Sequence, residues 1–441
     1  MKFYDRTQEI ARLREIDEVS QEVSQFTVIT GRRRIGKTEL VKKAYDDREM
    51  LYFFVARKAE SDLCTTFMEE IRNKLDVPMP DMKVHSFASV FKFVMEIACK
   101  NHLILFIDEF QDFYRINSSI FSEMQNIWDE YKSKARINLI VGGSVNTLLN
   151  KIFRDKKEPL YGRQTDTIKV RPFLPSVLKE ILKDHYPEFK AEDLLGLYVL
   201  TGGVAKYVEL FIDHKQYSLN KMLKAVFSPD SFFLTEGKSM LIEEFGRDYG
   251  TYFSILSLIA QGYNSRADIE DALGGIELSG YLRKLIEDYE LIEKHQPLYE
   301  TSINKNVRYA ITDHFFRFWF RFIYKYQHII EAGGIDKLLQ IVIRDYPTFS
   351  GLSLESYFKD CMKESGQYTR IGYWHDRRGE NEIDIIAEDE FEKQLKIFEV
   401  KRQAKNLDIN ILKDKADVFV RTVGRYKGYD ISCGGLSMED M

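Results

Sequence analysis

The stretch QFTVITGRRRIGKTELVKKAY, residues 25–45, decides how the front of this chain folds. The apolar run 26–29 predicts a buried strand, and the apolar spacing of 40–45 predicts a helix. Between them, Gly31 to Thr38 follow the pattern G-x-x-x-x-G-K-T, which is typical of a loop that binds phosphate groups. Its glycines let backbone amides turn toward phosphate oxygens, and the N-terminus of the next helix adds positive potential. The stretch therefore predicts a nucleotide site.

The residue types in this loop suit a phosphate ligand. Lys37 is expected to reach the β- and γ-phosphates of ATP, and Thr38 is expected to hold Mg²⁺. The whole predicted contact set is Gly31, Arg32, Arg33, Arg34, Ile35, Gly36, Lys37, Thr38 and Glu39. The sequence does not distinguish separate roles for the three consecutive arginines. A chance match in a surface loop is the alternative, and the order of strand, loop and helix argues against it.

An acidic strand end is expected to complete this site. The stretch HLILFIDEFQDF, residues 102–113, contains a continuous apolar run of the kind found in a parallel sheet covered on both faces. We expect this strand to neighbour the first one, with Asp108 and Glu109 at its carboxyl end, where parallel strands carry ligand chemistry. Asp108 would bind Mg²⁺ through water, and Glu109 would polarise the attacking water. An acidic pair that only caps the next helix is the alternative interpretation.

Two further polar positions follow the next apolar run, which covers 137–141. Ser144 or Asn146 could sense the γ-phosphate, although simple turn chemistry explains these residues equally well. Arg163, in the stretch EPLYGRQT, could serve as an arginine finger toward its own nucleotide or that of a neighbouring copy. An ordinary surface arginine is an equally good interpretation.

The order of these motifs resembles the archaeal-type ATPase family of the AAA+ class, which is related to the signalling NTPases. The resemblance is carried by FYDRTQEIARL, GRRRIGKT, FIDEFQ, GGS, LYGR and TGGVAKYVEL, and it covers about the first half of the chain. It implies that Asp5 and Arg6 lie near the adenine and that Ser144 is the first sensor. It also places Lys206 near the second-sensor position, although Ala205 stands where the family usually has proline.

The middle of the chain is expected to form a small helical module. Its sequence predicts a helix, a short helix, a third helix and a hairpin, which is the order of a winged helix. In a DNA-binding version, the third helix would present Tyr281, Arg283 and Lys284 to the major groove. Glu287 and Asp288 on the same helix oppose contact with phosphates. A packing or regulatory role is the alternative. The aromatic segment ITDHFFRFWFRFIYKY is predicted to lie in a core.

Carboxylates recur at the back of the chain, where the sequence predicts a helix, three strands, a helix and a strand. In EIDIIAEDEFEKQLKIFEVKR, residues 382–402, antiparallel pairing would bring Asp384 and Glu399 together. The first helix would lay Glu355 alongside them. Three such carboxylates repel one another unless a pKa rises or a cation neutralises them.

A divalent cation is the simpler of these two explanations. Mg²⁺ or Mn²⁺ held by Asp384, Glu399 and the carbonyl of Val400 would activate water, and Lys401 would orient it or stabilise charge on a phosphate. Together with the helical carboxylate, this pattern resembles the PD-(D/E)xK nuclease signature, with Ile383 replacing the proline. The resemblance implies a metal-dependent DNA nuclease fold. A plain strand end with surface charges, or a nuclease fold that has lost activity, are the alternatives.

Composition limits the remaining possibilities. With 441 residues, 44% of them hydrophobic and 30% charged, the chain is expected to form several globular domains. A net charge of -5 excludes a generally basic nucleic-acid coat. The four scattered cysteines show no spacing typical of zinc or disulfides, and no apolar run approaches the roughly 18 residues of a membrane span. We therefore expect a cytoplasmic protein without membrane contact.

The sequence as a whole predicts an α/β, multidomain fold. The expected domains are a P-loop ATPase core with a parallel sheet (1–165), a helical lid (166–240), a winged-helix module (241–315), an aromatic helical connector (316–344) and a restriction-endonuclease-like domain (345–441). The predicted function is an ATPase coupled to a metal-dependent DNA endonuclease-like domain. The alternatives are a nucleotide-driven switch or a DNA- or partner-binding regulator that cuts nothing. ATP is the expected ligand, and DNA, a second copy or another protein are the candidate partners.

Overall fold

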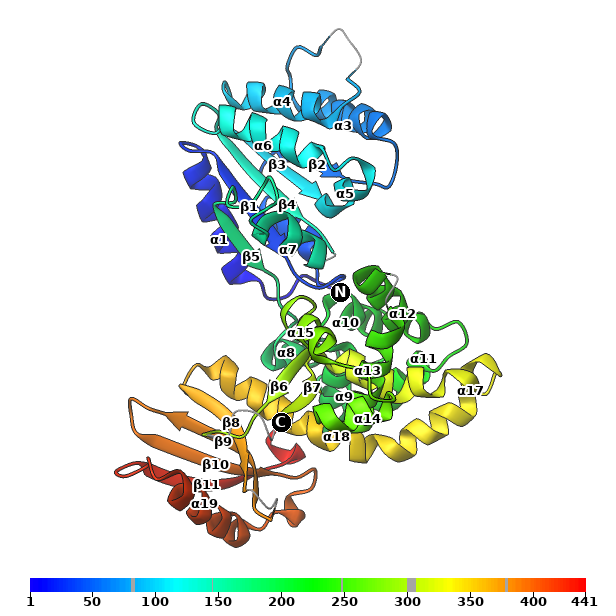
Figure 1. Cartoon of the computed structure of the whole chain (residues 1–441), viewed down its shortest axis with the longest axis vertical. Helices are drawn as coiled ribbons and strands as arrows, with labels where there is room; N and C mark the ends of the chain where they lie inside the picture. Colours follow the sequence, from blue (N-terminus) through cyan, green and yellow to red (C-terminus); the bar gives the residue numbers. More distant parts are fainter. Residues whose placement is uncertain (81–83, 145, 247–248, 300–306, 377–379) are drawn as a thin grey trace. The chain divides into compact units, whose positions relative to one another are not determined.

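The computed structural model describes residues 1–80, 84–144, 146–246, 249–299, 307–376 and 380–441. The chain divides into two compact units. One unit consists of residues 5–171, and the other consists of residues 1–4 together with 172–441. Figure 1 shows both units, and each is described here by itself.

The described residues of the first unit form a five-stranded parallel sheet in the order β2-β3-β4-β1-β5. Its strands are β1 (Gln25–Thr30), β2 (Leu51–Phe54), β3 (Leu103–Asp108), β4 (Ile137–Gly142) and β5 (Asp166–Lys169). The helices are α1 (Thr7–Ser20), α2 (Lys37–Ala44), α3 (Glu60–Lys74), α4 (Phe87–Ala98), α5 (Phe113–Ile116), α6 (Ile120–Tyr131) and α7 (Asn146–Arg154), with a short 3₁₀ turn η1 (Phe110–Asp112). Helices α1 and α2 pack together, and α4 packs against both α3 and α6.

The central strands are buried along their whole length. Every residue of β3 and β4 is buried, as expected for parallel strands with helices on both faces. Aromatic rings fill the core beneath the helices, with Phe26 edge-on to Trp128 at 5.1 Å and Phe53 stacked on Phe67 at 4.4 Å between ring centroids. The apolar runs in the sequence predicted these strands correctly.

The order of the strands differs from the prediction in one respect. The strand that ends in Asp108 was expected beside β1, but β4 pairs with both β1 and β3 and therefore lies between them. All three strands are apolar runs buried on both faces, so no residue pattern distinguishes which of them are neighbours.

The first unit also extends beyond the predicted boundary at residue 165. Strand β5 pairs in parallel with β1, from Thr27 opposite Asp166 to Thr30 opposite Lys169. It belongs to the sheet and not to the helical lid. Because β5 buries only Ile168, it lacks the apolar run by which the other strands could be predicted.

The second unit begins with helices and contains the predicted helical module. Its first helices are α8 (Pro175–His185), α9 (Ala191–Thr201), α10 (Ala205–Asp213), α11 (Leu219–Val226) and α12 (Phe232–Phe245). The module follows as α13 (Tyr249–Gln261), α14 (Arg266–Ala272), α15 (Ser279–Glu287) and the antiparallel strands β6 (Ile292–His295) and β7 (Arg308–Ile311). This is the element order that the sequence predicted.

The aromatic segment lies in a core, as predicted. It forms α16 (His314–Phe318), a π-helical turn η3 (Trp319–Ile323), a 3₁₀ turn η4 (Tyr324–Tyr326) and α17 (Gln327–Glu331). The buried indole of Trp319 donates to the carbonyl oxygen of Phe233 at 3.2 Å. A Cβ on Gly237 would lie 2.4 Å from the Trp319 ring, so a glycine is required for this close approach.

The C-terminal part of the second unit is a mixed sheet in the order β11-β10-β9-β8. Its elements are α18 (Ile335–Ser365), β8 (Arg370–His375), β9 (Glu382–Asp389), β10 (Gln394–Val400), a 3₁₀ turn η5 (Ala404–Asn406), α19 (Ile409–Val423), β11 (Asp430–Leu436) and a 3₁₀ turn η6 (Met438–Asp440). Strand β9 is antiparallel to β8 and β10, whereas β11 is parallel to β10. The predicted boundary at 344/345 lies inside α18, because Pro347 is accommodated within this helix and does not begin it.

The fold is therefore α/β and multidomain, as the sequence predicted. A parallel-sheet core occupies the first unit, and a separate mixed sheet occupies the end of the second (Figure 1). In the part of the chain that the structure describes, no helix combines the length and the apolar character needed to cross a membrane.

Candidate functional site

The phosphate-type loop joins the carboxyl end of β1 to the first turn of α2. Gly31 and Gly36 have φ angles of 142° and 97°, which a side chain would strain. A Cβ on Gly31 would also lie 2.5 Å from the carbonyl oxygen of Val170. The Lys37 ammonium lies within the loop, where Nζ donates to the carbonyl oxygens of Gly31 at 2.7 Å and Arg32 at 3.0 Å. Only 7% of Lys37 is exposed, so its charge is held inside the loop.

Asp108 meets the loop although its strand is not adjacent to β1. Thr38 Oγ1 donates to Asp108 Oδ2 at 2.6 Å, and the backbone N–H of Glu109 donates to Oδ1 at 2.9 Å. Asp108 is buried. A hydroxyl and a carboxylate oxygen at this separation form the all-oxygen donor set that suits a hard cation such as Mg²⁺.

Tyr52 is a neighbour of Asp108 that the sequence did not indicate. Its hydroxyl donates to Asp108 Oδ2 at 3.1 Å from strand β2. Burial raises the pKa of Tyr52, and the charge of Asp108 raises it further, so the hydroxyl keeps its proton and remains a donor. No motif marks this residue, since its position depends on the pairing of β2 with β3.

Glu109 lies at the turn that leaves β3. Its φ of 54° is in the left-handed region, which is uncommon for a residue with a side chain. Ser144 Oγ donates to Glu109 Oε2 at 2.7 Å, and Gln111 Nε2 donates to the same oxygen at 2.6 Å. The structure therefore brings Ser144 to the acidic strand end, and it adds Gln111, which no sequence motif indicates. Asn146 begins α7.

The C-terminal carboxylates form a second polar cluster. The register of β9 and β10 places Ile385 opposite Phe398, so Asp384 and Glu399 form the next pair. Lys401 Nζ lies 3.2 Å from Glu399 Oε1 and 3.8 Å from Asp384 Oδ2. The structure thus brings Asp384, Glu399 and Lys401 together.

Backbone and lysine groups neutralise these carboxylates. The backbone N–H of Val400 donates to Asp384 Oδ2 at 2.8 Å. Lys415, on α19, places Nζ 3.8 Å from Glu399 Oε1 and is a neighbour that the sequence did not indicate. Although burial opposes it, the charges of Asp384 and Glu399 raise the pKa of Lys401. Among the described residues, no three or more carboxylate, imidazole or thiol side chains are arranged to hold a metal ion.

Glu355 approaches the same cluster from α18. Burial raises the pKa of Glu355 to about 7; the nearby Lys359 ammonium opposes this shift and the Asp384 charge adds to it. Lys359 Nζ lies 3.8 Å from Glu355 Oε2. Burial in turn lowers the pKa of Lys359. The helical carboxylate is therefore within electrostatic range of Asp384, on a side chain that is 24% exposed.

We expect Glu355→Gln to change how stability depends on pH. Between the ordinary carboxyl pKa of 4.5 and about 7, folded Glu355 keeps a proton that the unfolded chain loses. The free energy of unfolding of the natural chain therefore falls as the pH rises through this window. The variant should lack this fall and gain about 1–3 kcal/mol relative to the natural chain between pH 5 and pH 8.

Thermal unfolding in a chelating buffer at both pH values measures this difference. Glu392→Gln, an exposed carboxyl at the turn between β9 and β10, is the matched control and should leave the pH dependence unchanged. Parallel pH curves for the Glu355 variant and the natural chain would contradict the burial of this carboxyl.

Comparison with known proteins places this geometry in a family. The chain is 31% identical over 422 residues to the uncharacterized protein MJECL04 of Methanocaldococcus jannaschii, which covers 92% of this chain and 89% of that protein. A family model described as an ATPase domain predominantly from Archaea matches residues 3–211. The chain belongs to this archaeal-type P-loop ATPase family. Residues 319–412 of this ATPase also match a model described as archaeal and bacterial proteins of unknown function.

A solved structure shows the same fold. The Walker-type ATPase PABY2304 of Pyrococcus abyssi aligns with 72% of this chain and 96% of its own, at 19% identity and a TM-score of 0.55. At this identity the likeness concerns the fold. It agrees with the parallel-sheet core described above.

Arg163 of the ATPase lies at the opposite end of the sheet from its own phosphate loop. It precedes β5, and Thr165 is hydrogen-bonded to Phe26 near the amino end of β1. Arg163 Nη2 lies 3.1 Å from Asp129 Oδ2 and lines a pocket of about 640 Å³. The six residues of β1 span about 20 Å, so Arg163 does not reach the nucleotide site of its own chain. The role of Arg163 as an arginine finger stays a prediction.

The other residues implied by the family resemblance are placed as follows. Asp5 and Arg6 both have left-handed φ angles, of 56° and 73°, and Arg6 is buried with Nη1 3.5 Å from Glu9 Oε1. Lys206 lies in the first turn of α10 in the second unit, where Nζ lies 2.6 Å from Glu209 Oε2. Their roles toward a nucleotide stay predictions.

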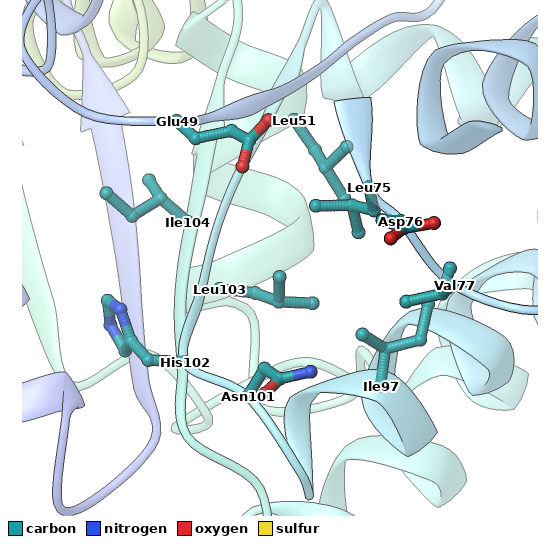
Figure 2. A pocket seen from close by; sticks show the side chains of 10 residues that line it. All are labelled: Glu49, Leu51, Leu75, Asp76, Val77, Ile97, Asn101, His102, Leu103 and Ile104. Carbon is teal, nitrogen blue, oxygen red and sulfur yellow. The ribbon is translucent and has the colours of Figure 1, made fainter. Parts of the chain in front are cut away.

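A second pocket of the ATPase domain is separate from the nucleotide site. Its volume is about 220 Å³, and Figure 2 shows mostly aliphatic side chains around it. Leu51 and Leu103 line it at the amino ends of β2 and β3, whereas the phosphate loop is at the carboxyl ends of the strands. Burial lowers the pKa of His102 in its wall, which favours a neutral ring. This pocket therefore lies at the amino ends of the strands, at the opposite end of the sheet from the nucleotide site.

Proposed function

We propose that this ATPase uses ATP binding and hydrolysis to govern a metal-dependent, DNA-cutting site in its C-terminal domain. The observation that carries the second half of this proposal is the meeting of Asp384 and Glu399 beside Lys401 at the ends of two antiparallel strands. The same side chains define the signature that the sequence resembles.

In the nucleotide half, the loop residues would bind the phosphates. Lys37 would exchange its contacts with the loop carbonyls for the β- and γ-phosphates, and Thr38 and Asp108 would hold Mg²⁺. When bound, this ion neutralises charge on the phosphate oxygens. Glu109 would orient and polarise the attacking water at the strand end.

In the C-terminal half, Asp384, Glu399 and the carbonyl of Val400 would hold Mg²⁺ or Mn²⁺. All three supply oxygen, which hard cations prefer, and both carboxylates are largely buried, with side chains 16% and 12% exposed. When bound, the ion lowers the pKa of its water. Lys401 would stabilise the charge that develops on a phosphodiester, and Glu355 would add negative potential beside the ion.

Contacts within the second unit support coupling between the predicted lid and this site. Arg402, which directly follows Lys401, forms an ion pair with Glu192 of α9 and a hydrogen bond with Ser350 of α18. Tyr198 of α9 also donates to Asp360 Oδ2 of α18 at 2.6 Å. One helix of the lid therefore contacts α18, which carries Glu355, and Arg402, which follows Lys401 at the end of β10.

A second candidate function is a nucleotide-driven regulator that cuts nothing. It is favoured by the lysines that neutralise the carboxylates and by the lack of a ready three-ligand arrangement among the described residues. The helical module fits this reading as a packing element, because the backbone N–H of Leu298 donates to the Tyr373 carbonyl of the C-terminal sheet at 2.9 Å. DNA contact by Tyr281, Arg283 and Lys284 is the competing role.

Assembly with a second copy is proposed for Arg163. Since this residue cannot serve its own phosphate loop, an arginine-finger role requires a neighbouring copy to supply the nucleotide. Such a role would make ATP hydrolysis depend on protein concentration.

The decisive experiment incubates the purified protein with supercoiled, linear and single-stranded DNA and Mn²⁺, with and without ATP. We expect nicks or cuts that require the metal and change with ATP. DNA that remains intact under every nucleotide condition, together with retained ATP hydrolysis, would support the regulator instead.

A further inference from the structure

The carboxylate of Glu109 is held on one side only. Ser144 Oγ and Gln111 Nε2 both donate to Oε2, at 2.7 and 2.6 Å. Within the described residues, no hydrogen bond from the protein reaches Oε1. The two donors therefore fix one oxygen of Glu109 and leave the other for a ligand.

Gln111 is a buried amide with a single satisfied end. Its exposed fraction is 0%, and Oε1 has no hydrogen-bond partner within the described part of the chain. The reverse orientation of the amide would place its oxygen against the carboxylate, so the donor must face Glu109. An unsatisfied buried amide oxygen costs about 1–3 kcal/mol, and an aliphatic side chain here would avoid this cost. A glutamine at this position therefore points to a role in the chemistry of the site.

The surrounding fold fixes Gln111 in this position. The left-handed backbone of Glu109 turns the chain from β3 into η1. Within η1, the side chain of Gln111 points back toward the carboxylate of Glu109. Phe110 anchors the turn by stacking on Phe153 at 5.7 Å between ring centroids. Gly143 provides the space, because a Cβ there would lie 1.8 Å from Gln111 Oε1.

We propose that Gln111 is a positioning residue for ATP hydrolysis in this protein. Together with Ser144, it holds Oε2 of Glu109 so that Oε1 accepts a hydrogen bond from the attacking water. Gly143 is part of the device, since only a residue without a side chain leaves room for the amide. This inference rests on the proposed role of Glu109 toward water.

The test replaces Gln111 with methionine, which keeps the length of the side chain and removes the donor. Loss of this hydrogen bond to a charged carboxylate should lower kcat of ATP hydrolysis about 10- to 100-fold. The KM for ATP and the affinity for a non-hydrolysable ATP analogue should stay within about twofold, since Gln111 contacts Glu109 and not the phosphate loop. Gln125→Met, the same exchange on α6, should behave as the natural protein.

Gly143→Ala tests the same contact without changing Gln111. Its methyl group should displace the amide and lower kcat by a similar factor. The double variant should then be no slower than either single variant, because both remove one interaction. The inference would be overturned if the kcat losses of the two single variants multiplied in the double variant. It would also be overturned if Gln111→Met had the kcat of the natural protein, or if its affinity for ATP fell together with kcat. Failure of both single variants to fold would also overturn it, in favour of a purely structural glutamine.

Glu109→Gln separates this inference from the proposed function on which it rests. A large loss of hydrolysis in this variant supports the role of Glu109, and the Gln111 and Gly143 results then decide the inference alone. Normal hydrolysis by Glu109→Gln would remove the role of Glu109, and the positioning role of Gln111 with it.

Discussion

Lys37→Ala is expected to abolish ATP hydrolysis, with a loss of at least about 10²- to 10³-fold in kcat/KM. The buried ammonium is held by the carbonyls of Gly31 and Arg32, directly where the phosphates would lie. Without it, the negative charge of the β- and γ-phosphates would lack its main cation from the protein. Release of inorganic phosphate from ATP with Mg²⁺ measures the effect.

Lys43→Ala is the matched control for this experiment. Lys43 lies on the same helix α2, but its side chain is 51% exposed and pairs with Asp46 at the surface. An exposed ion pair of this kind contributes little to the free energy of unfolding, so the stability of the variant should be nearly unchanged. ATP hydrolysis should also be nearly unchanged, because Lys43 lies outside the phosphate loop. If the Lys37 variant hydrolysed ATP as fast as the Lys43 variant, the predicted phosphate-binding role of the loop would be wrong.

Asp384→Asn is expected to reduce Mn²⁺-dependent nicking of DNA by at least about 100-fold and to leave ATP hydrolysis within about twofold. The amide oxygen of asparagine can still accept the backbone N–H of Val400, so the local fold is kept. The charge that would hold the ion and that pairs with Lys401 is lost. Nicking of supercoiled plasmid, followed over time at saturating Mn²⁺, measures the first quantity, and phosphate release measures the second.

Asp414→Asn on α19 controls for the loss of one negative charge in the same domain. This residue is exposed and lies outside the carboxylate cluster, so nicking should continue at the rate of the natural protein. Equal nicking by the Asp384 and Asp414 variants would remove the nuclease proposal, whereas the ATPase assignment would be unaffected because it depends on the first unit.

The local parts of the nucleotide site could be predicted because each depends on a short stretch of chain. The strand, glycine turn and helix around Lys37 are encoded within 25–45, and the apolar run before Asp108 marks a buried strand directly. The same holds for the C-terminal order of helix, three strands, helix and strand. In each case the pattern of apolar residues matches the period of the element that forms.

Neighbours across the sheet could not be predicted in this way. Tyr52 reaches Asp108 only because β2 pairs with β3, and Ser144 reaches Glu109 only because β4 lies beside β3. Gln111 is close to Glu109 in the sequence, but its contact needs the left-handed turn and the space above Gly143. Neither Tyr52 nor Gln111 stands out by type or spacing, and the sequence predicted Ser144 as a candidate sensor without indicating its contact with Glu109.

Charge balance at the C-terminal cluster also depended on long-range packing. The sequence indicated that buried carboxylates need compensation, and it favoured a cation. The structure shows three lysines from separate parts of the chain next to the carboxylates: Lys359 on α18, Lys401 directly after β10, and Lys415 on α19. Which ammonium groups approach was set by the packing of α18 and α19 against the sheet.

The sequence by itself determined the phosphate loop, the acidic strand end and the kinds of secondary structure in both units, because backbone conformation and the burial period are local properties of the chain. Only the tertiary structure decided that β4 separates β1 from β3, that Arg163 lies at the far edge of the sheet, and which donors hold Glu109. These features depend on how uniformly apolar strands pair with one another. Strands buried on both faces carry no residue pattern that specifies their neighbours, so the packing of the whole domain selects them.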